Sequence, residues 1–153
     1  MLHRFRPIAP FFHRPTPVAR QSRARLAIFH WSLLAAELFM GISAIVGGIG
    51  LMINRLGMPQ SALDHTPFEH FTIPGIILMT VGGVLVAAGW MVWIRHSFAL
   101  LASFAAGVVL LGWIVVESVM VRDGRPLQGT VLLFALLIIS LSWSQARVQR
   151  PPR

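Results

Sequence analysis

Two carboxylates, Glu37 and Glu117, lie within long apolar runs of the 153-residue sequence. An ionisable side chain inside a membrane-grade segment is costly unless it has a partner or a task, so both are candidate functional residues. The helical face of Glu37 also carries Gly41, Ala44 and Gly48, and the face that leads to Glu117 is similarly rich in small residues. Because small residues let membrane helices approach closely, we expect both carboxylates to face the interior of a bundle.

Two interpretations of Glu117 stay open at this point. It either forms a buried ion pair or hydrogen bond that fixes helix ends, or it is a ligand or proton site. The side chains available as outer partners are Arg55, Arg122, His65 and His70. The carboxylate lies about four residues from the predicted outer end of its span, which is roughly 6 Å along a helix.

Glu37 lies deeper than Glu117. It is about 11 residues from the predicted start of its span, roughly 16 Å along the helix and close to the middle of a bilayer. Charge is least tolerated at that depth, so we expect a neutral carboxyl that is packed or hydrogen-bonded to Ser103, Ser140 or the indole of Trp90. The two carboxylates then differ in depth by roughly 18 Å, too far apart to form an acid–base pair or a two-metal site.

A polar segment from Pro67 to Gly75 precedes the second apolar run. Its aromatic residues, beginning with Phe68, are three positions apart, which suits a short amphipathic segment lying in the membrane interface. Thr72 is predicted to be the N-cap of the next helix, with Pro74 in its first turn. We expect this segment to form a lid over the outer end of the bundle.

The sequence favours neither a metal site nor a cofactor. His70 and the acidic residues near it match no zinc spacing such as H-E-x-x-H. His30 and His96 fall near the inner face, but His96 is in a predicted turn, which does not suit a haem held between two helices. Cysteine is absent, which excludes disulfides and thiolate chemistry. We therefore predict no catalytic residues.

The composition is that of a membrane protein, with 56% hydrophobic and 12% charged residues. A soluble domain carries about 25% charged residues. Four apolar runs are long enough to cross a bilayer, for which about 20 residues suffice. They predict an all-α fold, a four-helix transmembrane bundle with a short interfacial segment in the first outer loop. The predicted membrane domain covers residues 26–144, with spans at 26–53, 73–94, 98–121 and 127–143.

Basic residues are concentrated outside these spans, and all 13 are arginine. Residues 1–25 contain six Arg, four Pro and no acid, and we predict a basic arm without regular helix. Residues 145–153 form a basic tail. With both termini in the cytoplasm, ten arginines lie on the inner side and three on the outer side, so the positive-inside rule favours this topology in an inner (plasma) membrane. The arginines at the termini predict contact with anionic lipid headgroups, not with nucleic acid.

Several short strings resemble a family of small bacterial four-span integral membrane proteins. The family shares the patterns S/T-P-F, I-P-G, V-G-G and G-W-I-x-V-E in this order, and here the matching residues are 66–68, 73–75, 81–83 and 112–117. The resemblance covers about residues 51–141, and the four-helix outline also looks like the broad DoxX-like class. It implies the bundle and groups Pro67, Phe68, Pro74, Gly75 and Trp113 with Glu117 in one feature. It implies no reaction.

These observations lead to three functional hypotheses. The first is a non-enzymatic membrane protein that binds a small or lipidic ligand or serves as an accessory subunit, with Glu117, Trp113 and His70 at its outer end. The second is an oligomeric transporter or proton-coupled element that uses Glu37 and Glu117. The third is a redox or quinone-associated membrane subunit. The partners expected are membrane lipids, together with either further copies of the chain or a larger membrane complex.

Overall fold

Four helices make up almost all of the chain that the computed structural model describes, which is residues 17–54, 67–120 and 126–148. All four are long and apolar enough to cross a membrane, and no strand occurs in the described ranges. The predicted all-α four-helix bundle is therefore confirmed. The helices are α1 (Pro17–Asn54), α2 (Thr72–Trp93), α3 (Ala99–Met120) and α4 (Pro126–Val148). Predictions made for residues 1–16, 55–66, 121–125 and 149–153 lie outside the described residues.

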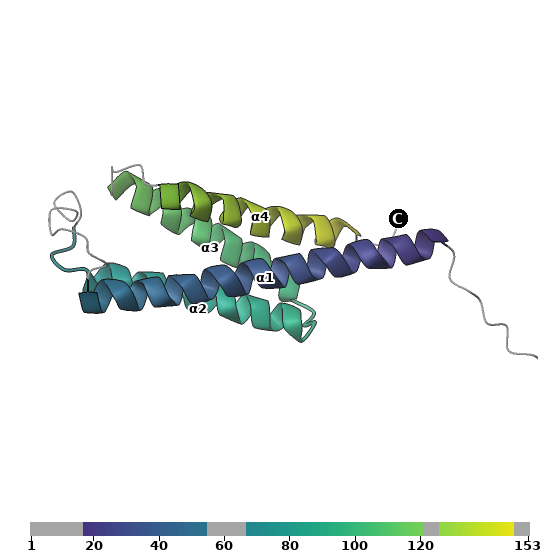
Figure 1. Cartoon of the computed structure of the whole chain (residues 1–153), viewed down its shortest axis with the longest axis horizontal. Helices are drawn as coiled ribbons and strands as arrows, with labels where there is room; N and C mark the ends of the chain where they lie inside the picture. Colours follow the sequence, from purple (N-terminus) through teal and green to yellow (C-terminus); the bar gives the residue numbers. More distant parts are fainter. Residues whose placement is uncertain (1–16, 55–66, 121–125, 149–153) are drawn as a thin grey trace, which may run out of the picture.

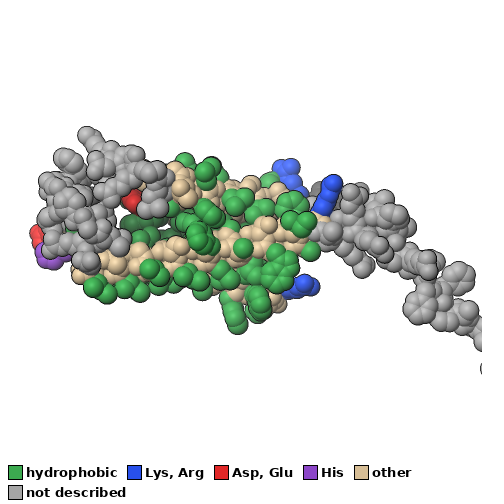
Figure 2. All heavy atoms as spheres, in the orientation of Figure 1, with side chains coloured by type: hydrophobic (Ala, Val, Ile, Leu, Met, Phe, Trp, Pro, Cys, Tyr) green, Lys and Arg blue, Asp and Glu red, His purple; other side chains and the backbone are tan. Residues whose placement is uncertain are grey.

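The helices run alternately up and down in two layers, with α1 beside α2 and α3 beside α4 (Figure 1). The part of α1 around residues 25–31, the turn between α2 and α3, and the end of α4 therefore meet at one end of the bundle, and the first turns of α1 extend beyond it (Figure 1). We call this the basic end, because it carries the described arginines, Arg25, Arg95 and Arg147. The described acidic and histidine side chains visible in Figure 2 lie at the opposite end.

Glycines bring the backbones of α1 and α2 into direct contact. A Cβ added to Gly82 would lie 2.6 Å from the carbonyl oxygen of Gly41, and one added to Gly41 would lie 3.0 Å from the carbonyl oxygen of Gly82. Gly48 and Gly75 form a second reciprocal pair, at 2.5 and 2.8 Å. Such close approach is possible only without side chains, which explains why small residues gather on this face. The neighbouring Gly83 does not pack in this way, because nothing lies within 4 Å of a Cβ added to it.

Among the residues whose side chains the structure describes, the core is apolar except for four buried polar side chains. Leu33, Leu85, Leu110 and Ile138 are among its fully buried members, one from each helix. Large apolar side chains also cover the outside of the bundle, as expected where the surrounding medium is lipid (Figure 2). The buried polar residues are Glu37, Ser103, Ser142 and Gln145, each less than 5% exposed.

Two local predictions are wrong. The arm at residues 1–25 is predicted to lack regular helix, but α1 begins at Pro17, because proline is well tolerated in the first turn of a helix. The predicted span 127–143 lies within α4, which continues to Val148. Phe71, not Thr72, is the N-cap of α2, and no side chain caps it. Phe71 is buried against Leu51, which fixes where the chain enters the helix.

Candidate functional site

Glu37 lies in the interior of the bundle, as its small-residue face predicts. The residue is 0% exposed and packs against α2, where a Cβ added to Gly89 would lie 3.5 Å from the Cβ of Glu37. Neither carboxyl oxygen has a hydrogen-bond partner among the described residues. A buried polar group in this state costs free energy, so Glu37 requires either a ligand or a compensating packing role.

Ser103 on α3 is one of the three partners predicted for Glu37, and it is the one that faces it. The two side chains are close enough to interact, but the Ser103 hydroxyl is outside hydrogen-bond geometry and has no partner of its own. The other two predicted partners are directed elsewhere. Ser140 donates to the carbonyl oxygens of Leu136 and Leu137 on its own helix, and Trp90 is 62% exposed.

The segment before α2 packs on the end of the α1–α2 layer. Phe71 is buried and Phe68 is half-buried, and both contact the cluster formed with Leu51 and Leu78. Pro67, Glu69 and His70 are exposed. Gly75 packs against Met52 and Gly48 of α1. Pro74, in the first turn of α2, is half-buried. The aromatic residues of the predicted lid therefore close the end of α1 and α2.

Trp113 and Glu117 lie on α3, and both are half-buried. Trp113 packs against the main core, and its indole Nε1 is buried with no hydrogen-bond partner in the described part of the chain. Glu117 follows Ser103, which is level with Glu37, by 14 positions along α3, or roughly 21 Å. The two carboxylates therefore lie far apart, as the sequence predicts.

A recess at the basic end was not predicted from the sequence. It has a volume of about 500 Å³ and lies between residues 26–31 of α1, the α2–α3 turn and the end of α4. This volume falls within the range of about 300–1,000 Å³ that small-molecule sites occupy. Its lining residues are Leu26, Ala27, His30, Trp31, Val92, Arg95, His96, Ser97, Ala99, Leu100 and Gln145.

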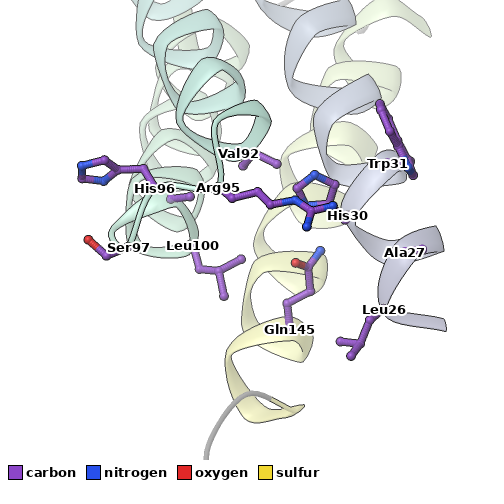
Figure 3. A pocket seen from close by; sticks show the side chains of 11 residues that line it. Leu26, Ala27, His30, Trp31, Val92, Arg95, His96, Ser97, Leu100 and Gln145 are labelled. Atoms are coloured by element: carbon purple, nitrogen blue, oxygen red, sulfur yellow. The ribbon is translucent and has the colours of Figure 1, made fainter. Parts of the chain in front are cut away.

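Three polar side chains converge in this recess, from three different segments. Arg95 extends from the α2–α3 turn toward His30 on α1, and Gln145 points into the same space from α4 (Figure 3). Arg95 is close enough to His30 to act on it electrostatically. Gln145 is only 4% exposed, and its amide Nε2 has no hydrogen-bond partner among the described residues.

Arg95 takes a backbone conformation that few arginines adopt. Its φ is 53°, the one positive value at a non-glycine residue in the described chain. Arg95 N–H donates to the Val92 carbonyl and His96 N–H donates to the Met91 carbonyl, at 3.0 and 2.9 Å. These two bonds define a Schellman motif, which ends a helix and usually places glycine where Arg95 stands. The side chain of His96 contacts the residue before α3, because its Nδ1 accepts a hydrogen bond of 3.2 Å from Phe98 N–H.

Tryptophans surround the basic end at the level of the recess. Trp31 lies beside His30 on α1 and its ring meets that of Trp93 on α2 edge-on, with centroids 6.0 Å apart. Trp143 on α4 lies 5.2 Å below the guanidinium of Arg147. These indoles, with Trp90, are 50–62% exposed. Exposed tryptophans at one level are typical of the boundary between the bilayer core and the headgroups.

Sequence reasoning missed this recess for an identifiable reason. His30 alone suggests a haem ligand, and Gln145 belongs to the predicted tail beyond the last span, so neither residue marks this site in the sequence. The available signal was the spacing along α4, where Ala135, Ile138, Ser142 and Gln145 are buried on one helical face. A buried face that becomes polar toward the helix end indicates an internal polar site.

The described residues form no group of three or more His, Asp or Glu side chains that could hold a metal ion. The chemistry available at the basic end is recognition, by a guanidinium, an imidazole and an amide donor. In the comparisons with protein families, curated proteins and solved structures, no family model, no curated protein and no solved structure matches this chain.

Proposed function

We propose that this chain is a small, non-enzymatic, multi-pass membrane protein that binds an amphiphilic molecule. The polar end of the molecule occupies the recess at the basic end, and its apolar part lies along the bundle in the bilayer. One observation carries the proposal: the buried amide Nε2 of Gln145 has no hydrogen-bond partner in the described part of the chain, and the side chain points into a recess at the level of the tryptophans. A donor in this state is satisfied when a polar ligand enters.

The membrane and the orientation belong to the same proposal. We place the chain in a bacterial inner membrane with the basic end at the cytoplasmic face. The arginines of the described chain support this, since Arg25, Arg95 and Arg147 all lie at that end. The recess then opens at the level of the cytoplasmic headgroups.

Native mass spectrometry of the full chain, purified in a mild detergent, tests the proposal. We expect an adduct of discrete mass on the wild-type protein, reduced in the Gln145→Leu variant, which removes the amide without removing the side-chain volume. Ser144→Leu, an exposed neighbour on α4, is the matched control and should retain the adduct. A wild-type protein that carries no adduct, or an adduct unaffected by Gln145→Leu, would contradict the proposal.

A second candidate is an oligomeric transporter or proton-coupled element that uses Glu37 and Glu117. One observation favours it, namely that the Glu37 carboxyl is fully buried and has no hydrogen bond to any residue that the structure describes. The separation of roughly 21 Å along α3 weighs against a direct relay between the two carboxylates. Flux measured in proteoliposomes tests this candidate. If it is right, Glu37→Gln abolishes flux while the folded yield is retained, and retained flux would contradict it.

A further inference from the structure

We infer that the recess binds the phosphate group of an anionic phospholipid headgroup, through Arg95 and Gln145. This inference rests on the proposed function, since it names the class of amphiphile that the same recess would take. The evidence comes from the charge and donors of the recess, from the backbone at Arg95 and from the level of the recess in the membrane.

The polar groups of the recess match an anion. Arg95 and His30 line it, and none of its described lining residues carries a carboxylate. Gln145 adds a buried amide donor that has no partner among the described residues. A guanidinium presents its N–H groups as a planar fork, which binds two phosphate oxygens at once, and the bonds are strengthened by charge. A neutral headgroup such as a sugar would leave the charge of Arg95 unmatched.

The backbone at Arg95 supports a role for its side chain. A left-handed conformation is unfavourable for a non-glycine residue, and glycine is the usual residue at this position of the motif. The turn alone would therefore be more stable with glycine at position 95. The arginine adds one thing to the turn, a guanidinium that extends over the recess toward His30 (Figure 3). Strain of this kind is typically found where a side chain must be held in place for binding.

The level of the recess points to a lipid as the source of the phosphate. Trp31 itself lines the recess. Its ring partner Trp93 is the last residue of α2, directly before the α2–α3 turn. Indoles settle at headgroup level, so the recess lies where lipid phosphates lie. Its remaining walls include the apolar side chains of Leu26, Ala27 and Leu100, which suit the glycerol ester region below a phosphate.

Binding to defined lipids tests this inference on the full chain. The protein is delipidated in dodecyl maltoside, and native mass spectrometry then counts the molecules bound from three additives: phosphatidylglycerol, diacylglycerol of the same acyl chains, and inorganic phosphate. We expect one phosphatidylglycerol to survive gentle activation and diacylglycerol to be lost. Inorganic phosphate, which lacks the acyl chains, should compete only at concentrations far above that of the lipid.

Variants at position 95 separate recognition from folding. Arg95→Gly keeps the turn, since glycine is favoured there, and should weaken phosphatidylglycerol binding by about tenfold or more, as for the loss of a charge-assisted hydrogen bond. Arg147→Gln is the matched control: it removes an arginine from the same end, and that arginine lies over Trp143 instead of lining the recess. It should leave binding within about twofold.

The outcomes distinguish this inference from the proposed function. Equal retention of diacylglycerol and phosphatidylglycerol would overturn phosphate recognition and leave a general amphiphile site. Equal losses in Arg95→Gly and Arg147→Gln would also overturn it, because diffuse charge would then explain the binding. Binding of inorganic phosphate without lipid would exclude the headgroup as the source. Absence of every amphiphile would remove the inference and the proposed function together.

Discussion

At the scale of the residue, Glu37 and Arg95 both take a position that costs stability. The carboxyl of Glu37 is buried without a hydrogen bond among the described residues, and Arg95 is left-handed where glycine is usual. Residues of this kind are expected at functional or strained sites, where local preference and global structure disagree. Both residues therefore allow a prediction about the stability of the protein that is independent of any ligand.

Replacing Glu37 by leucine should stabilise the protein. Leucine has a similar volume and no polar atoms to leave unsatisfied, so we expect a gain of about 1–3 kcal/mol in the free energy of unfolding. Thermal unfolding in detergent measures it as a higher midpoint temperature. Glu37→Gln, which keeps buried polar atoms, is the control and should show no comparable gain. A destabilised Glu37→Leu would mean that the carboxyl has a stabilising interaction.

Replacing Arg95 by glycine should stabilise the lipid-free protein by roughly 1 kcal/mol, because the strain of the left-handed backbone is relieved. Arg95→Ala is the matched control. It removes the same guanidinium but keeps a Cβ, so the strain stays and no gain is expected. Both are measured as shifts in the midpoint of thermal unfolding in delipidated samples. Equal midpoints for the two variants would show that the backbone at position 95 is not strained.

At the scale of the element, the two glycine pairs hold α1 and α2 together. An added methyl group at Gly82 has no room, since the carbonyl of Gly41 and the side chain of Ile45 lie within 2.8 Å of its position. The helices would have to separate. The next residue, Gly83, faces open space, so the chain provides its own control one position away.

Gly82→Ala should destabilise the fold by about 1–3 kcal/mol, the usual cost of inserting a group into a well-packed contact. Gly83→Ala should be neutral or slightly stabilising, because alanine favours the helix over glycine by up to about 1 kcal/mol. The loss of monodisperse protein on heating, followed by size-exclusion chromatography, compares the two. If both variants behave alike, α1 and α2 do not meet at Gly82.

At the scale of the whole molecule, the arginines and tryptophans at one end define an orientation that labelling can test. The chain has no cysteine, so a single introduced thiol reports without background. Ser97 and Thr72 are exposed and lie at opposite ends of α2. In spheroplasts, a membrane-impermeant maleimide should label Thr72→Cys directly and Ser97→Cys only after the membrane is disrupted. The reverse pattern would place the basic end outside.

The fold could be predicted from the sequence because apolar length and small-residue spacing are local properties. The same reasoning placed Glu37 inside, since the face it shares with Gly41 and Gly48 reads directly from the chain. The recess could not be predicted, because Arg95, His30 and Gln145 come from segments far apart in the sequence. The left-handed backbone of Arg95 was equally hidden, since no local signal marks an arginine where a glycine is usual.

The close glycine contacts have a consequence for the molecule as a whole. Every such contact in the described residues joins α1 to α2, or α3 to α4 through Gly107 against Ile138 and Ile139. These glycine contacts join the helices in two pairs that share one apolar core, and the recess has walls from both pairs. A lipid bound in the recess would contact both helix pairs and hold them together. The bilayer would then supply a structural component of the protein. Delipidation would weaken the contact between the α1–α2 pair and the α3–α4 pair before either pair unfolded.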